Sequence, residues 1–584
     1  QFVDRLHAHL HELAETIQPL GLHSLGQAPT DDHRIATVVM MLGKPYWHAA
    51  AQAAGVEEGE IDEAMVGPYE AMQQSIPFQV LQHALQGSGQ VARHEAGHEA
   101  AKVAAYAADP ALRTWLDQGR DWYARLGAHN ELPALLHALS GQYIPTSYGG
   151  DPVKNPDAFP TGRNLYGFDP ARVPSPQAWQ AGKQAAEQML DAHRKATGQT
   201  LSKVTFSLWS VETMRHQGML EAQALHLMGV EPVWDKGGRV VDVKLQSRQA
   251  LGRPRVDVVL SATGLYRDHF PNTLKLLAKA AKLVATTQEA DNPAWAFSQQ
   301  LRQRLLRQGV AEDVADDASQ TRIFSTATGE YGTGLPEATL ATDSWGNKEE
   351  GNAKLAQLYL SRMQTAYGPD EKRWGMQGVE GAAPGTNLYA EQLKGTQAAV
   401  LARSSNTYGM LTTDDPFQYL GGIGLAVRAL NGEAPALYIS NLRNPGATRT
   451  EAAQDFLAKE LATRQFHPGY IQGLMKEGYS GTLRVLDATN NLWGWTAVAH
   501  EIVRDDQWQE MADVYVNDKH QLGVQQWMEQ NNPHAYAQTM ERMLEAARKG
   551  YWQADPATLT QLKARYSELQ QRFDVHTANQ AFMD

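Results

Sequence analysis

Cysteine is absent from the 584 residues of this chain. The absence excludes disulfide bonds, thiolate nucleophiles and cysteine-ligated zinc or iron–sulfur sites within the chain. A cytoplasmic protein can lack cysteine by chance, and a periplasmic protein can lack it because stray thiols oxidise. We expect a cytoplasmic location, with a periplasmic one as the alternative.

Nucleotide-binding loops are missing as well. The sequence contains no G-x-x-x-x-G-K-[ST] loop, and its glycine pairs and triplets, such as Gly332 with Gly334, do not complete G-x-G-x-x-G. It contains no G-x-S-x-G motif either. If the reaction of this protein needs ATP, a partner must therefore hydrolyse it.

The chain also lacks long apolar runs and long basic runs. No apolar stretch approaches the roughly 18 to 20 residues of a membrane span, and residues 1–30 show no signal-peptide pattern. The net charge of -13 is spread along the chain. We therefore expect no membrane span and no nucleic-acid partner.

What is present describes an ordinary globular chain, with 42% hydrophobic and 20% charged residues. Its length predicts about three or four domains. The chain starts at Gln1 rather than methionine, inside an apparent helix with Phe2, Leu6, Leu10 and Leu13 at helical spacing. We expect it to be the carboxyl-terminal part of a longer polypeptide.

The distribution of apolar patterns and turn residues predicts a multidomain α/β protein with four regions. Residues 1–145 are mostly helical, residues 146–320 form an α/β domain, residues 321–445 form a second mixed α/β region, and residues 446–584 form a helical carboxyl-terminal region.

Two charged signatures in the first α/β region are the most informative part of the sequence. They run from Ser207 to Asp235 and from Leu251 to Pro271. Apolar patterning predicts a strand over 204–209, a helix over 212–228 and a second strand over 256–260. Open α/β sheets hold their ligands at the carboxyl ends of the strands, so we expect a site here. Charged residues expected at the ends of these elements are Glu212, Arg215, His216, Arg253, Arg255, Arg267, Asp268 and His269.

These signatures resemble the large subunit of cobaltochelatase and, more distantly, the porphyrin-binding large subunit of magnesium chelatase. Further blocks with the same order and spacing are FPTGRNLYGFDP (159–170), RIFSTATGEYGTGL (322–335), DDPFQYLGGIGLAV (414–427), HPGYIQGLMKEGYSG (467–481), LWGWTA (492–497) and NPHAYAQTMERMLEAARKGYW (532–552). The resemblance covers residues 18–552.

The resemblance implies a tetrapyrrole-binding chelatase subunit that inserts Co²⁺ into a corrin-ring precursor of the hydrogenobyrinate diamide type. Iron or Mg²⁺ is possible in place of Co²⁺, and ATP would be hydrolysed on separate ATPase subunits. The family's upstream H-G-x-L-E motif does not occur in this sequence. Two alternatives stay open: a paralogue that removes iron from haem, and a non-catalytic tetrapyrrole carrier.

A tetrapyrrole macrocycle is flat, apolar on both faces and ringed with carboxylates, so its site needs aromatic side chains and arginines. Metal insertion also needs a base for the pyrrole protons and weakly held ligands for the metal. The candidates for the carboxylates are Arg163, Arg215, Arg253, Arg255 and Arg267, and those for the ring faces are Tyr166, Trp209, Tyr331 and Tyr408. Glu212 and His216, at i and i+4, are the candidate catalytic and metal-handling pair. In the alternative interpretation Arg253 and Arg255 only stabilise a turn and strand, and Asp268 caps a helix.

One segment matches a known metal-binding motif at every defined position. His94-Glu95-Ala96-Gly97-His98 reads H-E-x-x-H, whose two histidines share a helix face and can bind zinc. His94 and His98 are therefore candidate metal ligands. A match this short arises by chance among 20 histidines, and we favour a solvated, alanine-rich helix over a zinc protease.

Overall fold

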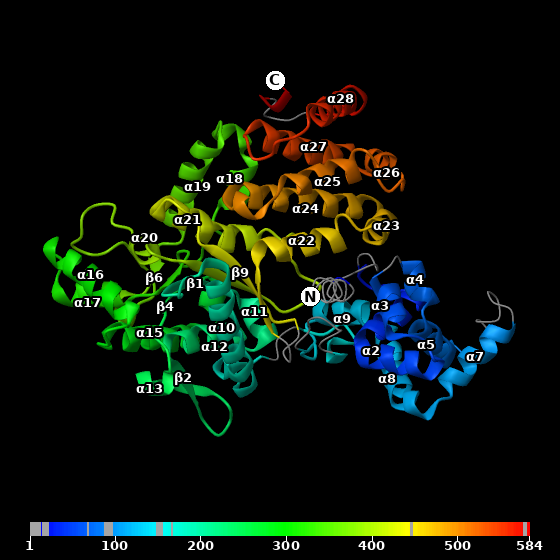
Figure 1. The fold of residues 1–584 in the computed structure, drawn as a ribbon, viewed down its shortest axis with the longest axis horizontal. Coiled ribbons are helices and arrows are strands. Elements are labelled where there is room, and N and C mark those ends of the chain that lie inside the picture. Colours follow the sequence, from blue (N-terminus) through cyan, green and yellow to red (C-terminus); the bar gives the residue numbers. More distant parts are fainter. Residues whose placement is uncertain are drawn as a thin grey trace.

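The computed structural model describes residues 13, 23–66, 69–86, 97–147, 156–164, 168–443, 448–575 and 581–583. The candidates His94, Glu95 and Tyr166 lie outside these residues, as does the side chain of His98. The predicted class is confirmed, because helices surround a mixed eight-stranded sheet. Figure 1 shows three parts: blue helices to one side, a green and yellow α/β part, and orange and red helices stacked above it.

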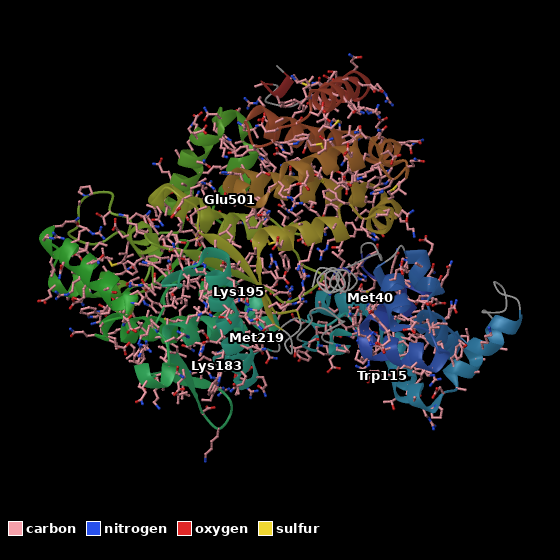
Figure 2. All side chains as sticks on the ribbon, in the orientation of Figure 1. Met40, Trp115, Lys183, Lys195, Met219 and Glu501 are labelled. Atoms are coloured by element: carbon pink, nitrogen blue, oxygen red, sulfur yellow. The ribbon has the colours of Figure 1, made fainter. Side chains whose placement is uncertain are left out.

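The first part is helical and has its own core. Its helices are α2 (Asp31–Ala54), α3 (Glu58–Val66), α4 (Tyr69–Gln74), α5 (Ile76–Gln86), α7 (Gly97–Ala107), α8 (Arg113–Leu126) and α9 (Glu131–Leu139). Buried side chains from α2, α5 and α8 form a cluster that shares no residue with the cores around the sheet. Figure 2 shows Trp115 in this part, well away from Met219 beside the sheet.

The sheet has the order β10-β9-β8-β1-β4-β5-β6-β7. Its strands are β1 (Lys203–Leu208), β4 (Asp257–Ala262), β5 (Ile323–Ser325), β6 (Thr365–Ala366), β7 (Met376–Gln377), β8 (Ala398–Arg403), β9 (Ala436–Asn441) and β10 (Arg449–Ala452). The central strands β9, β8, β1, β4 and β5 are parallel. Strand β1 lies at the switch point of the topology, with β4 and β5 on one side and β8 and β9 on the other.

Both faces of the sheet are covered, because alternate residues of a strand point to opposite faces. On β8, Val400 belongs to the core under α10 (Pro176–Thr197), α12 (Met219–Met228) and α15 (Pro271–Thr286). Leu401 belongs to the opposite core, which continues into the carboxyl-terminal helices. Helices that build this second side are α16 (Pro293–Arg307), α17 (Glu312–Gln320), α18 (Leu335–Leu340), α19 (Lys348–Arg362), α20 (Leu388–Leu393) and α21 (Gly422–Asn431).

The last part is helical after β10, the edge strand that lies within the region predicted to be helical from residue 446. It contains α22 (Ala453–Thr463), α23 (Pro468–Lys476), α24 (Gly478–Val498), α25 (Asp505–Tyr515), α26 (Val524–Asn531), α27 (Pro533–Arg548) and α28 (Pro556–Phe573). Helix α24 packs against α27 and α18, and against a short π-helix over Phe417–Gly421. In the part of the chain that the structure describes, no helix is long and apolar enough to cross a membrane.

The structure corrects the strand–helix–strand unit predicted over 204–260. The helix expected over 212–228 is two helices, α11 (Ser210–His216) and α12, because Gln217 and Gly218 have φ of 53° and 87°. A hairpin of β2 (Val230–Trp234) and β3 (Val240–Leu245) and a short helix α13 (Arg248–Leu251) then precede β4. Apolar periodicity did not reveal the break, since both helices carry buried residues.

The regions expected at 146–320 and 321–445 contribute to one sheet. The boundary between them falls between β4 and β5, which are paired neighbours. Helix α14 (Gly264–His269) is capped by the Thr263 hydroxyl. The next helix, α15, has Phe270 as its N-cap and no side-chain cap, so Asp268 caps neither helix.

Candidate functional site

A cavity of about 790 Å³ lies at the carboxyl ends of β1, β4 and β8. The residues that line it are Trp209, Ser210, Val211, Glu212, Arg215, Thr263, Gly264, Leu265, Tyr331, Gly332, Gly334, Pro336, Glu337, Leu358, Arg362, Arg403, Tyr408, Thr413, Asp414, Asp415, Gln418 and Tyr419. The set combines aromatic rings, three arginines and four carboxylates. Its position is the one that parallel sheets favour for ligands, beside the switch point at β1.

Glu212 forms an anionic centre in the wall of the cavity. It lies in the first turn of α11, is 2% exposed, and accepts hydrogen bonds from the Ser404 amide (3.0 Å) and hydroxyl (2.6 Å). Arg215 Nη1 lies 3.2 Å and Arg403 Nη1 3.5 Å from its Oε1. Burial raises the pKa of Glu212, but the two arginines and Ser404 outweigh burial and hold the pKa below its usual value. Glu212 is therefore a carboxylate whose oxygens already have partners.

The arginines of the cavity lie on aromatic rings. Arg403 lies 4.7 Å from the ring centre of Trp209, and Arg215 lies 4.0 Å from that of Tyr408. Trp209 in turn meets Tyr419 edge to face at 6.2 Å. These cation–π contacts orient the rings and leave them in the cavity wall.

Asp414 and Asp415 form a second, differently tuned acidic centre. They precede the π-helix, and the Gln418 side-chain amide donates to both, at 3.3 and 3.4 Å. Burial and the neighbouring Asp414 raise the pKa of Asp415 to about 6, against the attraction of Arg403. Burial likewise raises the pKa of Asp414. Asp415 can therefore exchange a proton near neutral pH, unlike Glu212.

His216 does not join Glu212 at the cavity. It is 2% exposed and does not line the cavity, and its Nδ1 accepts hydrogen bonds from the amides of Gly218 (3.2 Å) and Met219 (3.0 Å). Burial lowers the pKa of His216, against the attraction of Glu221 and Glu212. Both residues lie within α11, but His216 is its last residue, and its imidazole caps the start of α12 instead of reaching the cavity.

Arg253 and Arg255 lie at the opposite end of the sheet, before β4 begins. Arg253 donates to the carbonyls of His226 (2.7 Å) and Leu227 (3.2 Å). Arg255 is 1% exposed, donates to the carbonyls of Met228 (3.1 Å) and Gly229 (3.0 Å) and forms a bidentate pair with Glu289. Their guanidinium groups stabilise the end of α12, which matches the structural alternative.

Two other candidates, Arg267 and Arg163, lie outside the cavity lining. Arg267 donates to the carbonyls of Thr326 and Ala327 (both 2.8 Å) and pairs with Asp268, so it supports the loop that carries Tyr331 without lining the cavity. Arg163 donates to the Phe159 carbonyl at 3.1 Å and does not line the cavity. The structure thus brings together Trp209, Glu212, Arg215, Tyr331 and Tyr408 from the sequence-predicted set.

Residues that sequence reasoning did not assign complete the cavity. Arg403 is the last residue of β8, and Arg362 is the last residue of α19. Asp414 and Asp415 lie in the loop before the π-helix. The adjacent aspartates stand at the start of one of the blocks that carried the resemblance, which is the signal that could have found them. Among the described residues, no group of three or more histidine, aspartate or glutamate side chains is arranged to hold a metal ion.

Comparisons with known proteins match most of the chain. The family model described as CobN/Magnesium Chelatase matches residues 1–559. The aerobic cobaltochelatase subunit CobN of Pseudomonas aeruginosa is 30% identical over 577 residues, which cover 94% of this chain and 45% of that protein. The magnesium-chelatase large (H-type) subunit of Cereibacter sphaeroides is 33% identical over 451 residues, covering 77% of this chain and 35% of that protein.

A solved structure agrees. The catalytic subunit of cobaltochelatase from Mycobacterium tuberculosis aligns with a TM-score of 0.77 and 30% identity, over 94% of this chain and 45% of that one. The chain therefore spans between a third and a half of the length of these relatives. The resemblance drawn from the sequence motifs is confirmed.

Proposed function

Since the chain belongs to the CobN/magnesium chelatase family, we propose that its cavity binds a tetrapyrrole macrocycle for metal insertion. The observation that carries the proposal is the combination of residues at the carboxyl ends of β1, β4 and β8. Aromatic rings, arginines and two kinds of carboxylate line a volume of about 790 Å³, within the range of roughly 300 to 1,000 Å³ for ligand sites.

Each part of the cavity matches a part of a tetrapyrrole. The rings of Trp209, Tyr331 and Tyr408 offer faces for the apolar macrocycle. Arg215 and Arg362, whose side chains are 18% and 46% exposed, offer charge-assisted hydrogen bonds to peripheral carboxylates. Glu212 holds Arg215 and Arg403 in place, which is a different role from the proton acceptor expected from sequence.

We take Co²⁺ as the metal substrate and a corrin-ring precursor of the hydrogenobyrinate diamide type as the macrocycle. Two of the relatives are named as cobaltochelatase subunits, which favours Co²⁺, while a magnesium-chelatase relative supports Mg²⁺ as the alternative. The missing phosphate-binding loop supports ATP hydrolysis on partner subunits. Oxygen ligands of the cavity suit a metal that must be released.

A titration of the full chain with hydrogenobyrinate diamide, protoporphyrin and haem, followed by absorbance, tests the proposal. We expect saturable binding with preference for the diamide. Arg215→Gln should weaken binding about ten- to hundredfold, the usual range for a lost charged hydrogen bond. Arg239→Gln, on the exposed β2–β3 hairpin, is the matched control and should bind as the wild type does.

Each other outcome of the titration contradicts a defined part of the proposal. Absence of binding for all three compounds rejects the tetrapyrrole site. Preference for haem with iron release in the absence of ATPase subunits identifies a dechelatase. Tight binding without metal exchange identifies a carrier.

A further inference from the structure

We propose that Asp415, with Asp414 beside it, accepts the protons that the macrocycle loses as the metal enters, and that Gln418 positions both carboxylates. This inference rests on the proposed function and adds the residues that perform its proton transfer. It replaces Glu212, the sequence-based candidate, whose oxygens are occupied by two arginines and Ser404.

The orientation of Gln418 follows from its other partners. Its Oε1 accepts from the Thr333 backbone amide at 2.8 Å, and a backbone amide can only donate. The Gln418 amide nitrogen must then face Asp414 and Asp415, as the distances of 3.3 and 3.4 Å show. One side chain therefore holds both carboxylates at the cavity wall.

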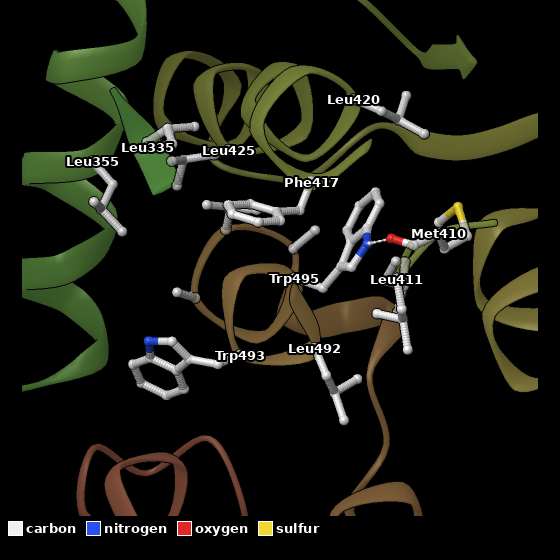
Figure 3. Packing of buried hydrophobic residues seen from close by; sticks show 14 of the residues in the cluster. Leu335, Leu355, Met410, Leu411, Phe417, Leu420, Leu425, Leu492, Trp493 and Trp495 are labelled. Atoms are coloured by element: carbon white, nitrogen blue, oxygen red, sulfur yellow. Dashed lines mark hydrogen bonds between the residues drawn. The ribbon is translucent and has the colours of Figure 1, made fainter. Parts of the chain in front are cut away.

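The loop that carries the two aspartates is held by a tightly packed helix pair. Gly494 of α24 lies so close to Phe417 that a Cβ there would come within 2.6 Å of the ring. Trp495 Nε1 donates to the Met410 carbonyl at 3.1 Å, and Figure 3 shows this bond beside Phe417. Contacts on both sides of Asp414 and Asp415 thus fix their position, and π-helices of this kind are frequent at functional sites.

An incompletely paired cation faces the aspartates. Arg403 is 1% exposed and lines the cavity, and among the described residues its Nε has no hydrogen-bond partner. The positive charge of Arg403 attracts both Asp415 and Glu212. A buried donor without a partner costs stability. An anionic group bound in the cavity beside Arg403 would supply the missing acceptor.

The charges around Asp414 and Asp415 favour a state in which the two carboxylates share one proton. Arg403 on β8 attracts negative charge at Asp415, whereas Glu337 on α18 and Asp487 on α24 oppose it at Asp414. Burial, together with the repulsion from Asp414, raises the pKa of Asp415 to about 6. Two carboxylates with opposite pKa shifts in one cavity, Glu212 and Asp415, then divide the roles of fixed anion and proton acceptor.

The proton transfer is balanced. Each ionisable inner N–H bond of the macrocycle, one in a corrin and two in a porphyrin, breaks, its electron pair stays on nitrogen and forms the bond to the metal, and the proton forms an O–H bond on an aspartate carboxylate. The total charge of ring, metal and aspartates is unchanged, and the corrin ring with Co²⁺ keeps one net positive charge, so no oxidant or reductant is needed. The protonated carboxyls return their protons to water at the mouth of the cavity.

The test is single-turnover insertion of Co²⁺ into hydrogenobyrinate diamide by the full chain, with ATP and cobaltochelatase ATPase subunits, as a function of pH. In wild type the rate should rise with pH through about 6, because the base must be deprotonated. Asp415→Asn should bind the diamide within about twofold of wild type, while its rate falls about 10²-fold or more and loses this pH dependence. Asp317→Asn is the matched control, a carboxyl on α17 whose pKa burial also raises but which lies outside the cavity.

Gln418→Leu tests the positioning role. It removes the amide donor from both aspartates, so the midpoint of the pH profile should move upward while diamide binding persists. An unchanged midpoint overturns that role, because a purely structural side chain would not set it.

Time-resolved infrared spectroscopy of wild type, with aspartate labelled by ¹³C, keeps the inference testable if a variant fails to fold. A neutral carboxylic acid band that shifts with the label should appear during insertion. Its absence, or wild-type kinetics in Asp415→Asn, overturns the inference and leaves the proposed function standing. Wild-type chain that binds no tetrapyrrole, or never exchanges metal, overturns the proposed chelatase itself and the inference with it.

Discussion

At the residue scale, surroundings decide what each carboxylate of the cavity can do. Glu212 and Asp415 line the same volume, and both are attracted by Arg403. Glu212 also has Arg215 and the Ser404 hydroxyl, so its pKa is lowered despite burial. Asp415 has Asp414 as its neighbour, so burial and repulsion raise its pKa to about 6. Identical chemistry thus yields one permanent anion and one titrating group.

Asp415→Asn should change how stability depends on pH. The pKa of Asp415 is about 6 when folded and 3.8 in the ordinary state, so the folded chain binds more protons between these values. Wild type should lose stability as pH rises from about 4 to about 6, by roughly 2 to 3 kcal/mol. The variant should lack this loss. Urea denaturation at several pH values measures it, with exposed Asp117→Asn as the control that should follow wild type.

Glu212→Gln should destabilise the fold even though the change in shape is small. It leaves Arg403, which is 1% exposed, without its closest anionic partner. Breaking a buried ion pair in this way typically costs about 3 to 5 kcal/mol. Glu187→Gln, which removes the 54% exposed partner of Arg253, should cost about 1 kcal/mol or less. Equal denaturation midpoints for the two variants would contradict the role of Glu212 as a buried counter-ion.

At the element scale, the break between α11 and α12 determines which residues reach the cavity. Helix α11 ends after two turns, so Glu212 and Arg215 face the cavity while His216 turns to cap α12. Gly218, with φ of 87°, allows this break. Glu212 and His216 both lie within α11, so the imidazole is directed away from the cavity by the amides at the start of α12 that follow directly.

Gly218→Ala should test the break. An added Cβ would lie 2.7 Å from Pro174 Cα and from Val173 Cγ1, in a backbone conformation that alanine disfavours. Gly252→Ala is the matched control, because φ is 71° there and, in the described part of the chain, nothing lies within 4 Å of the new Cβ. We expect the free energy of unfolding to fall by about 1 to 2 kcal/mol in the control, from backbone conformation alone. In Gly218→Ala it should fall by about 1 to 3 kcal/mol more, because the new Cβ overpacks the site. Equal losses in guanidinium denaturation would show that the packing against 173–174 is unimportant.

At the scale of the whole molecule, one sheet unites residues from 203 to 452. Strand β1 pairs with β4 on one side and with β8, nearly 200 residues later, on the other. The cavity therefore exists only when both segments are present. The helical part with residues 35–126 in its core is different, because its buried cluster is separate.

Division of the chain between residues 320 and 321 should abolish the fold of the sheet. Each fragment would expose strand edges that pair across the cut, β4 on one side and β5 and β8 on the other. A fragment over 168–584, which keeps the whole sheet, should unfold cooperatively near the temperature of the full chain. Circular dichroism melts compare them, and a cooperative melt of fragment 321–584 would contradict the prediction.

The isolated chain should bind no ATP with useful affinity. Its sequence has neither a phosphate-binding loop nor a complete dinucleotide fingerprint. Equilibrium binding of labelled ATP in the presence of Mg²⁺ measures this, and saturable micromolar binding to the pure chain would refute it.

The sequence by itself determined the class of the fold, the strands at β1 and β4, and the end of the sheet at which the cavity lies. Apolar alternation and helical spacing are local properties, and the carboxyl ends of parallel strands collect ligands whatever the loops contain. Trp209, Glu212 and Arg215 could be predicted for this reason, since they directly follow β1.

Only the tertiary structure decided which distant residues join the cavity and which of the predicted residues lie outside it. Arg403 and Asp415 reach the cavity because β8 pairs with β1 across nearly 200 residues, a register that no local pattern records. Arg255 was assigned to the site from its charge, yet it lies before β4 and not after it. The pKa values of Glu212 and Asp415 likewise depend on neighbours from distant segments. Local sequence specifies an element and its ends, whereas electrostatics and enclosure arise from what the fold places across from it.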